Sequence, residues 1–95
     1  MPTAPLSVTA AQDAKKGVDL SWSAPTSNGG SAITGYRIYR STSSGTETLL
    51  TTVAATARTY RDQSTVHNRR YYYVIRAVNA VGVSPASSEV TAIAR

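Results

Sequence analysis

The sequence predicts an all-β protein in which seven antiparallel strands form a β-sandwich. The clearest sign is residues 71–79, which hold half of the six tyrosines, alternate between two faces and contain neither Gly nor Pro. A second sign is the composition, in which Thr, Val, Tyr and Ser dominate and no segment has the apolar spacing of a helix. A third is the even spacing of short alternating segments between turn residues, which is typical of β-sandwiches.

The first two strands are expected at residues 6–10 and 18–23. The first alternates Leu, Val and Ala with Ser and Thr, and the second alternates Val, Leu and Trp with Asp and Ser. Residues 14–17 are expected to form the turn between them. Pro25 should end the second strand, and residues 26–32, which contain Asn-Gly-Gly, should form a flexible loop.

The third strand is expected at residues 33–40. Successive side chains of a strand point to opposite faces, so Tyr36 and Ile38 share one face while Arg37 and Tyr39 share the other. We assign the first pair to the core.

The fourth and fifth strands have weaker signals. Residues 46–53 should place Leu49 and Val53 on one face, with Leu50 on the opposite face. Residues 58–62 are expected to form a short strand with a Tyr at its centre.

The last two strands are expected at residues 71–79 and 88–94, joined by a loop around Gly82. Period two puts Tyr71, Tyr73, Ile75 and Ala77 on the inward face of the longer strand, and Tyr72, Val74 and Arg76 on the outward face. With the earlier strands, this predicts a structural core of Leu20, Trp22, Tyr36, Ile38, Tyr71, Tyr73 and Ile75.

Three landmarks line up in this pattern. They are Trp22, then Gly35-Tyr36-Arg37-Ile38, then Tyr71-x-Tyr73-x-Ile75-x-Ala77-x-Asn79 with the following Gly82 and Ser84-Pro85. Together they resemble the fibronectin type III domain over residues 5–93. The resemblance implies an immunoglobulin-like sandwich with strands A, B and E in one sheet and C, C′, F and G in the other. It also implies a central position for Trp22, and a tyrosine corner in which the Tyr71 hydroxyl bonds to upstream backbone.

The segment before Tyr71 departs from the family pattern. The family usually has an apolar residue and a Gly-containing turn there, whereas residues 65–70 read Thr-Val-His-Asn-Arg-Arg. Either Thr65 or Val66 is expected to be the buried anchor.

Other segments resemble the modules found between domains of secreted bacterial carbohydrate-degrading enzymes. These are Ser23-Ala24-Pro25, Ser27-Asn28-Gly29-Gly30 and Tyr36-Arg37-Ile38-Tyr39-Arg40-Ser41. The chain has no Arg-Gly-Asp triplet, so no residues support an integrin-binding role.

Length and composition limit the remaining possibilities. The 95 residues predict one domain over residues 6–94, preceded by a lead-in or linker at 1–5 without the features of a signal peptide. We interpret Met1 as a start codon placed before an excised module. The chain has no Cys, which excludes disulfides, and no apolar run approaches the ~20 residues of a membrane helix. The net charge is +5, but the basic residues are scattered, so we expect no nucleic-acid or membrane partner.

Few residues suggest chemistry. His67 is the only histidine, and we expect it to be a turn residue rather than a catalytic or metal-binding group. The acids are isolated in sequence and suggest neither an acid/base pair nor a calcium loop; they are Asp13, Asp19, Glu47, Asp62 and Glu89. Asp62, at a strand end, is expected to bond nearby backbone N–H groups. We therefore expect no catalytic residue, no cofactor, no metal and no enzyme activity.

One surface could bind a partner. Arg37 and Tyr39 should lie beside Tyr72 and Arg76, because their strands are neighbours in the implied fold. Such a basic, aromatic patch could stack a sugar ring or take an acidic partner. Packing of Arg stems over Tyr rings on a solvated face explains it more simply.

Two further regions contain candidate binding residues. Arg69 and Arg70, with His67, could meet a sulfated or phosphorylated polymer, but a solvated loop is the simpler interpretation. The loops at 26–32 and 79–86 lack Trp, Tyr or Arg anchors and are expected to be short connectors.

The sequence thus favours a non-catalytic spacer module from a larger, secreted or cell-surface bacterial protein such as a glycoside hydrolase. Seven strands running up and down leave the termini at opposite poles, so flanking domains would extend in line. We expect a monomer whose partners are those flanking domains, with at most a weak polysaccharide or protein contact. The alternatives are a binding module that uses the patch or the two loops, and an engineered fibronectin type III scaffold.

Overall fold

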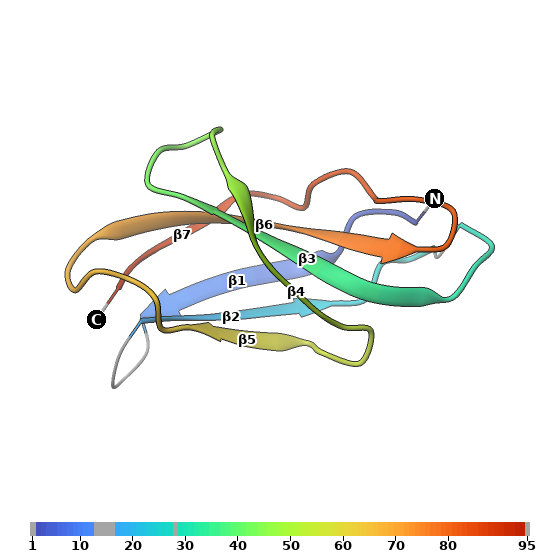
Figure 1. Ribbon diagram of the computed structural model, residues 1–95, viewed down its shortest axis with the longest axis horizontal. Coiled ribbons are helices and arrows are strands. Elements are labelled where there is room, and N and C mark those ends of the chain that lie inside the picture. The colour runs from blue at the N-terminus through green and yellow to red at the C-terminus, as the bar shows by residue number, and fades with distance from the viewer. Residues whose placement is uncertain (1, 13–16, 28, 95) are drawn as a thin grey trace.

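Seven antiparallel strands form two sheets that pack face to face (Figure 1). The computed structural model describes residues 2–12, 17–27 and 29–94. The strands are β1 (Leu6–Gln12), β2 (Val18–Ser23), β3 (Ile33–Ser41), β4 (Thr48–Ala54), β5 (Thr59–Asp62), β6 (Arg70–Asn79) and β7 (Val90–Ile93). One sheet has the order β1-β2-β5 and the other β4-β3-β6-β7. This confirms the predicted sandwich and its division into sheets A-B-E and C-C′-F-G.

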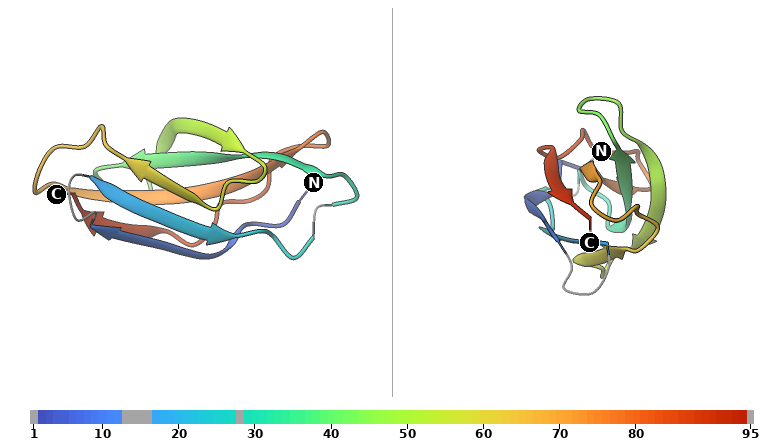
Figure 2. Two further views of the ribbon diagram at one scale, coloured as in Figure 1. Left: turned by 90° about the horizontal axis from the view of Figure 1, so that it is seen from below. Right: turned by 90° about the vertical axis from the view of Figure 1, so that its left-hand side faces the viewer.

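The molecule is elongated, with extents of 41 × 24 × 19 Å. The chain enters near one end of the long axis and leaves near the other, as Figure 2 shows from a second side. The two chain ends lie at opposite ends because the number of strands is odd and their direction alternates, so the first and last strands run the same way. The described residues contain no helix long and apolar enough to cross a membrane.

The core lies between the sheets and follows the alternation of the strands. In β2 and β6 every second side chain is buried. The seven side chains expected in the core are all buried in the structure, together with Val18, Ala77 and Ala94. The Trp22 and Tyr36 rings, from opposite sheets, meet at a centroid distance of 5.6 Å and an angle of 58°. This contact puts Trp22 between the two layers.

The faces expected for the fourth strand are wrong. Leu50 and Val53 both pack against the core, whereas Leu49 is 54% exposed. The reason is an irregularity in the pairing with β3, where Ile38 faces Thr51 but Tyr39 already faces Leu49. Such a β-bulge inserts one unpaired residue, here Leu50, and so reverses the alternation along β4.

The start of β1 is also irregular. Val8 and Ala10 pack against the core, but Leu6 is exposed. Ser7 has a φ of 52°, and the register shifts between Leu6 and Thr9. The left-handed backbone at Ser7 breaks the alternation and turns Leu6 away from the core.

The segment before β1 packs on the sandwich. Pro2 and Pro5 are buried, and the backbone N–H of Thr3 donates to the Ser27 carbonyl at 2.9 Å. Of the turn expected at residues 14–17, only Gly17 lies within the described residues.

Candidate functional site

The four residues expected to form a binding surface lie on the outward face of the four-stranded sheet. We call Arg37, Tyr39, Tyr72 and Arg76 the basic face. In the β3–β6 ladder Arg37 is directly opposite Arg76, and Tyr72 is opposite Ser41. All four side chains are half-buried.

Arg76 is held by two contacts within this face. Its guanidinium lies 5.6 Å from the ring centroid of Tyr39, and its Nη1 donates to the Ser84 carbonyl at 3.1 Å. The Arg37 side chain makes no hydrogen bond or ion pair with any residue that the structure describes. Cross-strand packing therefore accounts for Arg76 but not for Arg37.

The structure has a groove on the opposite side, on the outward face of β1, β2 and β5. Its volume is about 530 Å³, and its lining residues are Thr9, Ala11, Asp19, Leu20, Ser21, Thr59, Tyr60, Arg61 and Gln63. Short side chains such as Thr9, Ala11 and Ser21 leave the sheet surface uncovered. An ion pair between Asp19 and Arg61, at 3.2 Å, lies on its surface. Sequence reasoning missed this groove, although the run of small outward residues on the first two strands was a signal for it.

Asp62 is the centre of a buried polar cluster. The Tyr73 hydroxyl donates to Asp62 Oδ2 at 2.6 Å, and Arg40 Nη1 forms an ion pair with the same oxygen at 3.0 Å. The backbone N–H and the hydroxyl of Ser64 donate to Oδ1 at 3.2 and 2.9 Å. The expected bond to nearby backbone is present, but the two side-chain partners on β3 and β6 were not foreseen.

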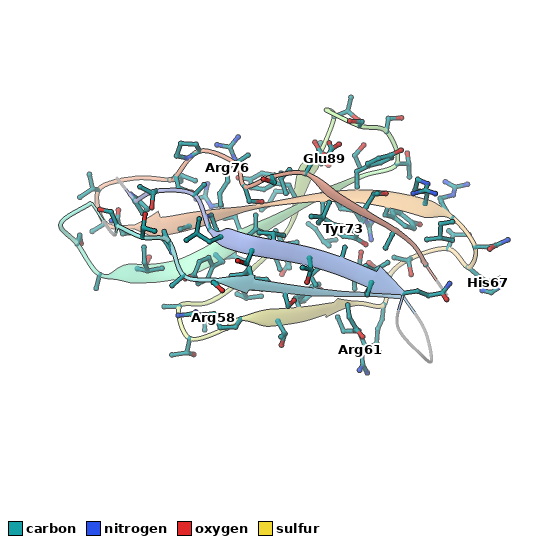
Figure 3. All side chains as sticks on the ribbon, turned by 180° about the vertical axis from the view of Figure 1, so that it is seen from behind. Arg58, Arg61, His67, Tyr73, Arg76 and Glu89 are labelled. Atoms are coloured by element: carbon teal, nitrogen blue, oxygen red, sulfur yellow. The ribbon has the colours of Figure 1, made fainter. Side chains whose placement is uncertain are left out.

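Electrostatics in this cluster favour the charged carboxylate. Burial alone would raise the pKa of Asp62, but hydrogen bonds from Tyr73, Arg40 and Ser64 outweigh it and hold the pKa below its ordinary value. Burial and the neighbouring carboxylate raise the pKa of the Tyr73 hydroxyl well above its ordinary range. Asp62 thus stays ionised and Tyr73 stays protonated. Their hydrogen bond joins β5 of one sheet to β6 of the other, and Figure 3 shows Tyr73 inside the sandwich.

Two acids that are far apart in sequence lie together in the structure. Glu89, just before β7, accepts from the Ser44 hydroxyl at 2.6 Å and from the Gly45 N–H at 3.0 Å, and it interacts with Glu47. Burial and the Glu89 carboxylate raise the pKa of Glu47, whereas the pKa of Glu89 is lowered, first by its bond with Glu47. The β3–β4 hairpin brings the pair together, a long-range contact that no local pattern encodes. Among the described residues, no group of three or more His, Asp or Glu side chains could hold a metal ion.

The tyrosine corner implied by the resemblance is present. The backbone N–H of Val66 donates to the Tyr71 hydroxyl at 2.8 Å. Asn68 adopts a φ of 68°, so it makes the turn for which the family usually has a Gly. Of the two candidate anchors, Thr65 is half-buried and Val66 is 56% exposed.

The other sequence candidates lie in loops, except Arg70, which is the first residue of β6. His67, Arg69 and Arg70 are exposed, and Figure 3 shows His67 at one end of the molecule. At the opposite end, the Asn79 amide donates to the Ser31 carbonyl at 3.2 Å and so connects the loops 26–32 and 79–86.

Comparisons with known proteins agree with this architecture. The sequence model of the family described as "Fibronectin type III domain" matches residues 3–93. Endoglucanase B of Cellulomonas fimi is 39% identical over 95% of this chain, and Exoglucanase A of the same species is 40% identical over 92%. The chain spans only 8% and 9% of the lengths of these two relatives. A solved Fn3-like protein from Clostridium thermocellum has a TM-score of 0.82 and 28% identity, with 96% of this chain and 91% of that one covered.

Proposed function

Because the chain belongs to the fibronectin type III family, we propose that it is a non-catalytic spacer module of a larger bacterial protein that degrades polysaccharides. The observation that carries this proposal is the position of the two chain ends near opposite ends of a 41 Å axis. Domains attached at those ends would be held apart, in line, by one domain length. The packing of residues 2–5 on the sandwich supports a defined direction for the preceding chain.

The chemistry of the described acids supports a structural role. Asp62 is saturated by donors from its own chain, Asp19 pairs with Arg61, and Glu89 is held by the β3–β4 hairpin. A general acid or base must be within hydrogen-bond reach of the substrate proton that it transfers, whereas these carboxylates are bonded to groups of their own chain. Each of these groups serves to join segments of this fold.

The relatives support the choice of parent. Two glucanases contain a segment similar to nearly the whole of this chain, and that segment is a small part of each. We infer a glycoside hydrolase or a similar enzyme as the parent, with this module beside its other domains. Because polysaccharides are too large to enter a cell, we infer a secreted or cell-surface location.

The spacer role is tested by joining two copies of the chain end to end and measuring small-angle X-ray scattering. A maximum dimension near twice the 41 Å length is expected. A dimension close to that of one copy, from two copies folded side by side, would contradict the proposal. In parallel, the single domain is expected to release no reducing ends from a soluble glucan.

A second candidate, a binding module, is favoured by one observation. Arg37 lies on the basic face without a partner among the described residues.

A further inference from the structure

Two arginines face each other at the centre of the four-stranded sheet. Arg37 of β3 and Arg76 of β6 are direct partners in the antiparallel register. Directly opposed residues have their Cβ atoms roughly 5 Å apart on the same face, and like charges at that spacing destabilise a sheet. Packing on Tyr39 accounts for Arg76, but no contact of the described residues accounts for a second arginine at position 37.

No carboxylate among the described residues neutralises the pair. Asp19 and Asp62 belong to the other sheet, and each already has an arginine partner, which is Arg61 for Asp19 and Arg40 of β3 for Asp62. Glu47 and Glu89 interact with each other beside the β3–β4 hairpin. Neither Arg37 nor Arg76 forms an ion pair with a carboxylate of the described residues, so the centre of this outward face keeps its positive charge.

Both guanidinium groups keep donors for a partner. Arginine has five N–H donors, and Arg76 uses Nη1 on the Ser84 carbonyl while Arg37 uses none on a described residue. A carboxylate matches the planar fork of arginine and can take two parallel hydrogen bonds from it. The charge and the free donors thus point to a ligand that carries carboxylates.

Aromatic and apolar side chains lie on the same face. Tyr39, opposite Val74, lies next to the arginine pair, and the exposed Leu49 is its partner on β4. Tyr72 lies four residues before Arg76 on β6, about 13 Å away along the strand. A polymer crossing this face would meet apolar and ring surfaces as well as charge.

We propose that the basic face binds a carboxylate-bearing polysaccharide. Arg37 and Arg76 take the carboxylates, and Tyr39 and Tyr72 contact the sugar rings. The acidic group of the ligand follows from the charge and the free donors of the two arginines, and a carboxylate fits the fork of a guanidinium. The sugar rests on the proposed function, in which the module belongs to a polysaccharide-degrading protein.

The test measures binding of the domain to polygalacturonate by calorimetry at about 0.15 M salt, where charges farther apart than about 8 Å are largely screened. Saturable binding is expected. An Arg37→Gln, Arg76→Gln double variant should bind at least about tenfold more weakly. A tenfold loss of affinity corresponds to about 1.4 kcal/mol of binding free energy.

The matched control is an Arg61→Gln, Arg69→Gln double variant. It loses the same charge from the other sheet and from the loop before β6, where both side chains are exposed, and it is expected to keep most of the affinity. Polyglutamate provides a second control, since it carries carboxylates without sugar rings. A Tyr39→Ala, Tyr72→Ala double variant should weaken binding of polygalacturonate but not of polyglutamate.

Three results would overturn the proposal. They are an absence of binding, an equal loss in the two arginine variants, and polyglutamate binding as tight as that of polygalacturonate. Equilibrium denaturation shows whether each variant folds, and relief of the like-charge repulsion is expected to offset part of the loss of the Arg76 contacts with Tyr39 and Ser84. The scattering test of the spacer role is independent, because the length of a two-copy chain does not depend on ligand binding.

Discussion

At the scale of single residues, Asp62 is the centre of a buried polar cluster. Its carboxylate receives hydrogen bonds from Tyr73, Arg40 and Ser64, and its side chain is fully buried. A buried charge is tolerated only when it is paired and hydrogen-bonded, so removal of the charge should be costly.

Asp62→Asn is expected to lower the free energy of unfolding by about 1–3 kcal/mol at neutral pH, since Tyr73 and Arg40 lose a charged acceptor. The matched control is Asp19→Asn, which breaks an exposed ion pair and should cost less than about 1 kcal/mol. Chemical denaturation measures both. Equal costs would show that the buried cluster does not stabilise the fold.

The same carboxylate predicts a pH dependence. Its folded pKa is below the ordinary value, so its contribution is present above the unfolded pKa of about 3.9 and is lost as pH falls through the folded pKa. Stability should therefore decline below about pH 4, and more steeply in the wild type than in Asp62→Asn. Denaturation curves between neutral and acid pH check this, and parallel declines in the two proteins would argue against it.

The tyrosine corner is expected to contribute less than Asp62 to the free energy of unfolding. Tyr71→Phe removes the acceptor for the Val66 N–H while keeping the ring beneath the Arg40 guanidinium. A loss of about 0.5–1.5 kcal/mol is expected for one hydrogen bond. Tyr72→Phe on the outward face provides the control, and a larger loss there would mean that the corner contributes little.

At the scale of elements, the turn into β2 depends on a close backbone approach. Gly17 has a φ of 86°, and a Cβ there would overlap the backbone carbonyl of Asp62 on the adjacent β5. Gly45 has a φ of 83° but has nothing within 4 Å of such a Cβ.

Gly45→Ala should therefore cost about 1–2 kcal/mol, from its left-handed backbone alone, whereas Gly17→Ala should cost more. The difference between the two melting curves measures the steric contribution. Similar losses would mean that the strand spacing adjusts freely to the extra methyl group.

The bulge in β4 gives a second test at this scale. Leu50→Ala should cost about 2 kcal/mol, at the low end for core leucines, because its side chain packs against the core. Leu49→Ala, one residue earlier, should change stability by less than about 0.5 kcal/mol, as is usual for exposed positions. A larger loss for Leu49→Ala than for Leu50→Ala would mean that β4 keeps a regular alternation, with Leu49 facing the core.

At the scale of the whole molecule, shape limits what the domain can hold. The basic face lies on a sheet whose side chains stand side by side, whereas most small-ligand sites are concave. We therefore expect the basic face to have no measurable affinity for neutral polysaccharides such as cellulose, chitin, unsubstituted xylan and starch.

Pull-down and calorimetry against these polymers check this expectation. Saturable binding that disappears in the Tyr39→Ala, Tyr72→Ala variant would contradict it. Binding that disappears only on addition of salt would reflect the net charge of +5, a screened and non-specific effect.

The sequence by itself determined the strands, their inward faces and the sandwich. Alternation in β2 and β6 is a local property, and long uninterrupted segments with period two leave one choice of buried face. The landmarks Trp22 and Tyr71 then indicated the family and, through it, the order of the sheets. The neighbouring positions of Arg37 and Arg76 followed from that order.

Only the tertiary structure decided features that depend on pairing between distant segments. The bulge at Leu50 arises from the register with β3, and alternation within β4 could not reveal it. Asp62 meets Arg40 and Tyr73 across the sandwich, although 22 and 11 residues separate them from it along the chain. The direct opposition of Arg37 and Arg76 likewise depends on register, since a shift by one residue would have turned one of them to the other face.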